Sequence, residues 1–196
     1  MIAQNLTRKE QSHKRIVEVA ARAIRRAGYR GVGVADIMKE AGLTHGGFYA
    51  HFASRDALLV EAMQQASRDN QTALSEAMAR RMAKGHSKFS ALIRAYLHDT
   101  HLDRAESGCV VAALASEMTR QGDAVQQEAK QRVTALVEFV RSALPEGVDP
   151  TQAEVMTATM VGALQLARTL GGAAGRALLA QTREALMLKY QPMSAP

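Results

Sequence analysis

Apolar residues recur with helical spacing along this 196-residue chain, and no stretch shows the sustained apolar–polar alternation of a strand. Thr7 and Glu10 have capping-box spacing, and they predict a first helix that ends at Gly28. A short second helix is predicted from Val34 to Ala41, a third is capped by Thr44, and a long fourth is capped by Ser54. Further helices are predicted over residues 89–97, 110–118, 133–144, 150–171 and 174–189. The pattern predicts an all-α fold of about nine helices.

Basic charge is concentrated in the first third of the chain. Residues 1–60 contain ten Lys and Arg against five Asp and Glu, whereas residues 61–196 contain fifteen against fourteen. This asymmetry favours a polyanion-binding N-terminal part joined to a nearly neutral remainder. A solvated basic helix face is the alternative explanation.

The sequence contains a single cysteine and no motif that addresses it to a membrane. A lone thiol fits a reducing compartment, and the N-terminus has no apolar run after a basic cluster. The longest apolar run, CVVAALA, is far shorter than a membrane span. We therefore expect a cytoplasmic protein.

Two short helices joined at AGL, residues 41–43, have the spacing of a helix-turn-helix, in which the second helix enters the DNA major groove. Gly46 and Gly47 lie in the first turn of that second helix, where each costs roughly 1 kcal/mol relative to alanine. Glycines there would let the backbone approach a duplex closely, and the helix N-terminus would favour phosphate. Phe48 and Phe52, four residues apart, are expected in the core.

The run GVGVADIMKEAGLTHGGFYAHFASRDALLVEAM, residues 31–63, resembles the DNA-binding headpiece of the tetracycline-repressor (TetR) family. This resemblance implies a homodimeric transcriptional regulator, usually a repressor that a small ligand releases from a DNA operator. It implies a helix-turn-helix DNA-binding domain over residues 1–55, with the motif at about 33–52. Residues 56–196 would form a helical effector-binding and dimerisation domain. Outside the headpiece the similarity is weaker and includes GCVVAALASEM.

The resemblance also implies roles for individual residues. Thr44 and His45 match positions that face the groove and contact bases, while Tyr49, His51 and Arg55 match phosphate-contacting positions. Gly33 stands where many members have a capping Ser or Thr, and Gly46 and Gly47 remove two base-reading side chains. Specificity would then depend more on the remaining residues and on DNA shape.

Other chemistries find less support in the sequence. His98 and His101, with Asp99 and Asp103 nearby, could hold a metal, but a solvated helix end is the commoner explanation, and we predict no metal and no cofactor. No GxSxG, HExxH or phosphate-binding glycine loop is present, so we do not expect an enzyme. A helical interaction protein that uses its basic end on an acidic partner or a membrane surface is the competing class.

The C-terminal part is predicted to pair the chain with a second copy and to hold an effector. Small residues in the last two helices suit a four-helix dimer interface or ordinary packing within the chain; they are Gly162, Ala163, Ala167 and Gly175. A dimer predicts a palindromic operator with half-sites about one helical turn apart. Candidate effector-lining residues are Phe89, Tyr96, Cys109, Met118, Met156 and Met160, each of which could instead be core. Cys109 could sense electrophiles as a thiolate, but a small buried core residue is the favoured interpretation.

Overall fold

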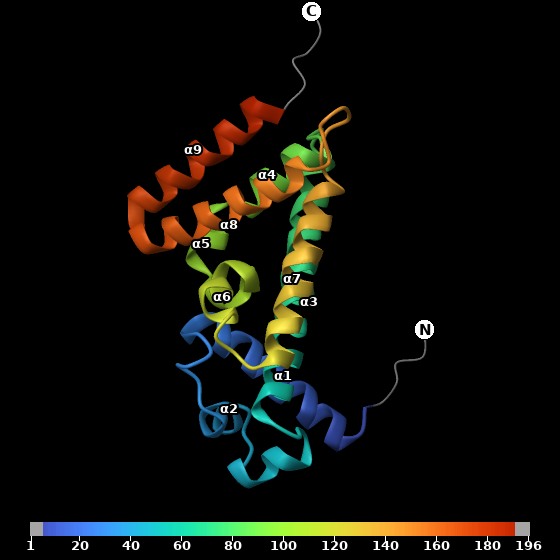
Figure 1. Ribbon diagram of the computed structural model, residues 1–196, viewed down its shortest axis with the longest axis vertical. Helices are drawn as coiled ribbons and strands as arrows, with labels where there is room; N and C mark the ends of the chain where they lie inside the picture. The colour runs from blue at the N-terminus through green and yellow to red at the C-terminus, as the bar shows by residue number, and fades with distance from the viewer. Residues whose placement is uncertain (1–5, 191–196) are drawn as a thin grey trace, which may run out of the picture.

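The computed structural model describes residues 6–190, and the regular elements within that range are all helices joined by turns and loops (Figure 1). The α-helices are α1 (Arg8–Ala27), α2 (Val34–Glu40), α3 (Arg55–Met82), α4 (Lys88–Tyr96), α5 (Asp99–Asp103), α6 (Val110–Met118), α7 (Asp123–Arg141), α8 (Gln152–Leu170) and α9 (Gly172–Tyr190). Two 3₁₀ helices, η1 (His45–Ala50) and η2 (Ala105–Ser107), complete the set. The predicted all-α class is confirmed.

The helix starts follow from local chemistry. Thr7 accepts the Glu10 N–H while the Glu10 carboxylate accepts the Thr7 N–H, so the predicted capping box is confirmed. Ser54 accepts the Ala57 N–H at 3.1 Å and starts α3, also as predicted. Asp149 accepts the Thr151 N–H ahead of α8.

Three sequence-based assignments need correction. Helix α7 begins at Asp123, ten residues before the predicted start, because its first turns bury only Val125, Glu128 and Ala129 and show little apolar periodicity. Helix α5 was not predicted, since five residues are too few to establish a period. The third predicted helix is η1, a 3₁₀ rather than an α-helix.

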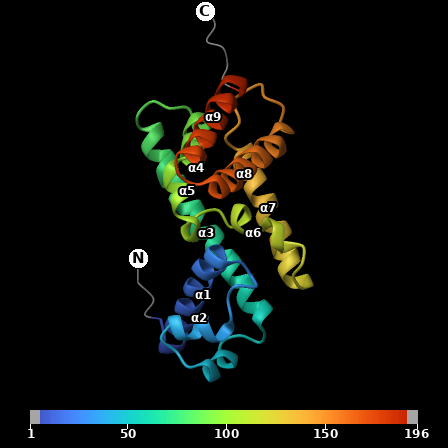
Figure 2. The same ribbon diagram turned by 90° about the vertical axis from the view of Figure 1, so that its left-hand side faces the viewer.

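Helix α3 joins the two ends of the molecule. Its 28 residues span about 42 Å. Its first half packs on α1 at the end that carries α2 and η1, and it also contacts α4 and α7 (Figures 1 and 2). Helices α8 and α9 pack on each other at the opposite end, where the gradient ends in orange and red (Figure 1). A movement of α3 would therefore displace helices at both ends of the molecule. No helix among residues 6–190 is long and apolar enough to cross a membrane.

Candidate DNA-binding site

Two phenylalanines anchor η1 and orient its outer residues. Phe48 and Phe52 are buried, and their rings stack with centroids 5.5 Å apart. The ring of His13 from α1 stacks on Phe52 at 4.5 Å. Because this face is fixed inward, the opposite face of η1 is exposed, and the Tyr49 side chain is 75% exposed. The predicted core role of the two phenylalanines is confirmed.

The exposed face of η1 contains most of the residues assigned to DNA contact. Thr44, His45, Gly46 and Tyr49 are exposed, and Gly47 is partly exposed. They lie at the tip of the molecule, in the cyan segment at the bottom of Figure 1, at the opposite end from α9. The structure thus brings these predicted residues together on one accessible surface.

The 3₁₀ geometry of η1 changes the role of Thr44. Its backbone occupies the N-cap position, but its side chain makes no capping hydrogen bond, contrary to the sequence-based prediction. The η1 bonds run over three residues, as in Gly47 N–H to the Thr44 carbonyl at 3.0 Å. Two adjacent glycines have a low α-helix propensity. The six residues of η1, anchored by the buried Phe48, can therefore adopt the tighter 3₁₀ turn. The Thr44 hydroxyl is therefore not used for capping.

Neither glycine of η1 is required by backbone conformation or by packing against residues 6–190. A Cβ built on Gly46 would meet no atom within 4 Å, and one on Gly47 would lie 3.7 Å from Thr44 Oγ1 and 3.8 Å from Met38 Cε. These are ordinary contacts, and neither residue has a positive φ. The two structural explanations for a glycine at these positions are a positive φ angle and tight internal packing, and neither applies.

We expect Gly46→Ala and Gly47→Ala to act in opposite directions on stability and on DNA binding. Helix propensity and a less flexible unfolded chain should leave the protein as stable or raise its free energy of unfolding by up to about 1 kcal/mol. Operator affinity should fall, because a methyl group would stand between backbone and duplex. Thermal melting and operator titration of both variants measure the two effects. Unchanged affinity in both would exclude the close-approach explanation.

His51 and Arg55 are partly buried at the edge of this surface. Burial, with smaller effects of His13 and Lys9, lowers the pKa of His51, and its buried Nδ1 atom has no hydrogen-bond partner among residues 6–190. The guanidinium of Arg55 donates to the Tyr29 carbonyl and so ties the start of α3 to the chain after α1. Arginine has further donors that remain for phosphate. Both phosphate roles stay predictions.

Two contacts that the sequence did not reveal link α1 and the turn after it to the two ends of the α6 region. The buried Arg25 donates at 3.2 Å to the carbonyls of Ala66 in α3 and Gly108 just before α6. The Tyr29 N–H donates at 3.0 Å to the carboxylate of Glu117, near the end of α6. The one available signal for Arg25 was its position four residues after Ala21, which puts both on one helical face. Through these contacts, a displacement of α6 would reach the headpiece, residues 7–55.

The structure disperses the six candidate effector residues. Cys109, Met118 and Phe89 line three different cavities, of about 60, 350 and 260 Å³. Tyr96, Met156 and Met160 are wholly buried in the shared core. Cys109 is also buried at the start of α6, as expected for a core residue. The effector assignment of these residues stays a prediction.

A buried histidine links two of these candidates. The Nδ1 atom of His101 lies 2.8 Å from the Tyr96 carbonyl, and its Nε2 accepts the Cys109 N–H at 2.9 Å. Because Nε2 must accept, the ring is neutral with its proton on Nδ1. Burial lowers the pKa of His101 to about 4. With both nitrogens occupied, His101 is not disposed to bind a metal, and residues 6–190 contain no cluster of three or more His, Cys, Asp or Glu that could hold one.

This histidine predicts a pH dependence of folding. Between its ordinary pKa of 6.5 and the folded value of about 4, the unfolded chain binds a proton at His101 that the folded chain does not, so stability falls as pH falls through this window. Urea unfolding of wild type and His101→Gln at pH 7.5 and 5 should show that the wild type loses about 2 kcal/mol more over this interval. Equal losses in the two proteins would contradict the assignment.

Comparison with known proteins agrees with this architecture. Residues 16–62 match the family model described as bacterial regulatory proteins, tetR family. A TetR family transcriptional regulator from Agrobacterium tumefaciens is 24% identical, with 94% of this chain and 100% of that chain covered and a TM-score of 0.74. Regulators from Chloroflexus aurantiacus (23% identity, 93% and 96% coverage, TM-score 0.76) and Cytophaga hutchinsonii (16%, 97% and 100%, 0.78) are also similar. No match was found among curated proteins.

The family match contains α2, η1 and the start of α3, and thus the whole exposed face described above. The similar structures extend over nearly the full chain and show its fold. Residues 16–62 therefore form a tetR-family domain, and the chain has the fold of the TetR family transcriptional regulators, in which this helix-turn-helix domain is followed by a larger helical domain.

Proposed function

We propose that this protein is a sequence-specific DNA-binding transcriptional regulator of the cytoplasm, and that it acts as a homodimeric repressor. Residues 1–55 form its DNA-binding domain, and residues 56–196 bind the effector and form the dimer. The observation that carries the proposal is the exposed face of η1, with Thr44, His45 and Tyr49 at the tip of a tetR-family domain. The basic excess of the first 60 residues supports contact with phosphates.

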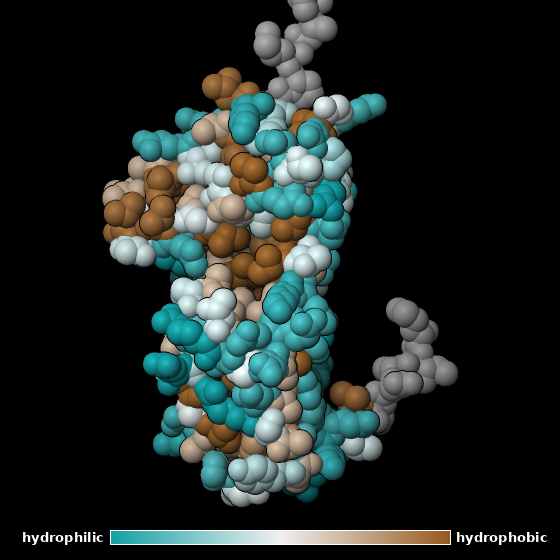
Figure 3. All heavy atoms as spheres, in the orientation of Figure 1, coloured by the Kyte–Doolittle hydropathy of each residue, from teal (hydrophilic) through white to brown (hydrophobic). Residues whose placement is uncertain are grey.

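An exposed apolar surface on α8 and α9 supports the dimer. Leu166 and Leu170 are 60% and 58% exposed on α8, and Leu188 is 88% exposed on α9. Val155, at 48%, lies on the same side of α8 as Leu166, three helical turns away. Figure 3 shows apolar side chains gathered over the corner where α8 meets α9. Large apolar side chains left in water at this density are typical of a protein–protein interface.

The small residues of α8 and α9 contribute to this surface indirectly. Ala163, Ala167 and Gly175 are buried, and a Cβ on Gly175 would lie 2.3 Å from the Ala167 carbonyl oxygen. Gly175 and Ala167 thus pack α9 on α8 within one chain, whereas a Cβ on Gly162 would meet no atom of the described residues within 4 Å. The proposed interface is therefore the outer face of this helix pair.

A movement of α6 would transmit ligand binding to the headpiece and so release the protein from DNA. A ligand in the larger domain changes DNA affinity only if it binds the released state more tightly than the DNA-bound state. The Arg25–Gly108 and Tyr29–Glu117 contacts join α6 to the headpiece, so a ligand that shifts α6 would move α1. The effector is a small molecule, and the two copies would bind a palindromic operator.

Sedimentation velocity and footprinting test the assembly together. The free protein should sediment as a dimer at micromolar concentration, and the protected DNA should contain two inverted half-sites centred about one helical turn apart. A monomer in solution, or a single unrepeated half-site, would count against the homodimer.

A further inference from the structure

A second charged surface lies at the end of the molecule opposite the headpiece. Here the end of α3, the loop after it, α4, the start of α5 and α9 enclose an open cavity of about 540 Å³. Its lining residues are Arg80, Arg81, Lys84, His86, Arg94, His98, Asp99 and Arg183. Five of these carry a fixed positive charge and one is acidic. We call this cavity the basic pocket.

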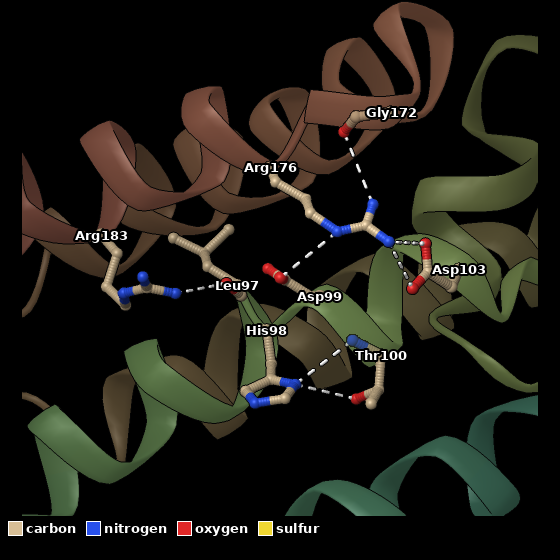
Figure 4. Close-up of polar contacts among 8 residues, drawn as sticks. All are labelled: Leu97, His98, Asp99, Thr100, Asp103, Gly172, Arg176 and Arg183. Atoms are coloured by element: carbon tan, nitrogen blue, oxygen red, sulfur yellow. Dashed lines mark hydrogen bonds and ion pairs between the residues drawn. The ribbon is translucent and has the colours of Figure 1, made fainter. Parts of the chain in front are cut away.

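Asp99, the acidic residue among the described lining of the basic pocket, is directed to another cation. Asp99 Oδ2 lies 3.5 Å from Nε of Arg176, which also contacts Asp103 (Figure 4). Glu76 lies 3.9 Å from Arg80, but both side chains are about two-thirds exposed, so this pair contributes little. The basic pocket therefore keeps a large excess of positive charge.

Three arginines of the basic pocket are held in place by hydrogen bonds. Arg81 donates to the Ala77 carbonyl at 3.0 Å, and Arg94 donates to Ser90 Oγ at 3.2 Å. Arg183 on α9 donates to the Leu97 carbonyl at 3.0 Å and so reaches across to the end of α4 (Figure 4). Burial, followed by repulsion from Arg80, Arg94 and Arg183, lowers the pKa of Arg81. These contacts hold like charges close together, and a bound anion would reduce the electrostatic repulsion between them.

We propose that the basic pocket binds a small, multiply charged anion of the phosphate class, such as a polyphosphate or a compact phosphorylated metabolite. Guanidinium groups match phosphate oxygens in geometry and charge, and cations from three helices exceed what a monovalent anion would neutralise. Among the described residues, the lining contains no aliphatic, phenylalanine or tyrosine side chain, which favours a compact charged ligand over an apolar one. The volume lies within the range of small-molecule sites.

This site is distinct from the operator surface and goes beyond the proposed function. Arg81 follows Arg55 by 26 residues along α3, which places them roughly 39 Å apart along the helix axis. An anion here would bridge α3, α4 and α9, and so connect the helix that reaches the headpiece with the helix proposed to form the dimer. Its binding can be measured without DNA.

Calorimetric titration of the full chain with pyrophosphate, at constant ionic strength and without divalent cations, tests the assignment. The wild type should bind saturably, and Arg81→Gln and Arg94→Gln should each weaken binding at least about tenfold. Arg94 is exposed, so its variant should fold normally. The matched control is Arg120→Gln, since Arg120 is exposed outside the pocket and donates to the carbonyl four residues before it, as Arg81 does. This control should bind like the wild type.

The alternative is that these arginines only stabilise the ends of α3 and α4. In that case Arg81→Gln would lower the melting temperature but leave pyrophosphate affinity unchanged. Equal affinities in the wild type and all three variants would overturn the proposal, as would the absence of saturable binding in the wild type at millimolar pyrophosphate. If pyrophosphate bound to cations of the headpiece instead, the wild type and all three variants would bind it equally. The same comparison therefore distinguishes the two sites.

Discussion

Arg25→Ala should lower the free energy of unfolding by about 3 kcal/mol, because it removes a buried charge that three parts of the chain share. The Arg25 side chain is 1% exposed. It donates to the carbonyls of Ala21, Ala66 and Gly108, and lies 3.7 Å from Asp69. Burial lowers the pKa of Arg25, while Asp69 opposes this shift. Hydrogen bonds from a charged donor contribute more than neutral ones, and the truncation also leaves a cavity.

The neighbouring Arg22 provides a control on the same helix. Arg22 is exposed, so Arg22→Ala should change stability by less than about 0.5 kcal/mol. For a chain of this length, 3 kcal/mol corresponds to a melting temperature roughly 6–12 °C lower. If the two variants melted at the same temperature, the contacts of Arg25 with α3 and with Gly108 would not contribute to stability.

Leu166→Glu should convert the dimer to monomers and weaken operator binding by at least about a hundredfold. The side chain is already 60% exposed in the single chain, so the folded protomer should retain its stability. In a dimer the new carboxylate would be buried without a partner, which costs several kcal/mol. Loss of the second protomer removes the gain from two linked half-site contacts.

Val133→Glu is the matched control for the interface, since Val133 is 40% exposed on α7, outside the α8 and α9 surface. Sedimentation and operator titration of both variants should separate them. A dimeric Leu166→Glu with full operator affinity would place the interface elsewhere.

Patterns that depend on near neighbours in the chain predicted much of the fold. The capping box at Thr7, the cap at Ser54 and the inward pair Phe48 and Phe52 are all local, and the structure contains each of them. The 3₁₀ form of η1 was not predicted, because over six residues a repeat of 3.0 cannot be told from one of 3.6.

Features that depend on contacts between residues far apart in the chain could not be predicted from the sequence. Whether Gly175 meets its own chain or a second copy is a matter of tertiary packing, and the structure shows that it meets Ala167. The hydrogen bond from Arg25 to the Gly108 carbonyl joins residues 83 positions apart. The arginines of the basic pocket lie at positions between 80 and 183, and their spacing along the chain follows no periodic pattern that would predict their proximity.

We propose that Thr44 and His45 select a particular DNA sequence. Genomic fragments should be incubated with the wild type and with a Thr44→Ala, His45→Ala double variant, then recovered with the protein at moderate salt and sequenced. Both residues are exposed, so the variant should melt like the wild type. We predict that the wild type retains a small set of fragments sharing a palindrome and that the variant loses this selection while keeping weak, salt-sensitive binding. Unselective, salt-erased retention by the wild type, or the same selected set with the variant, would contradict the claim.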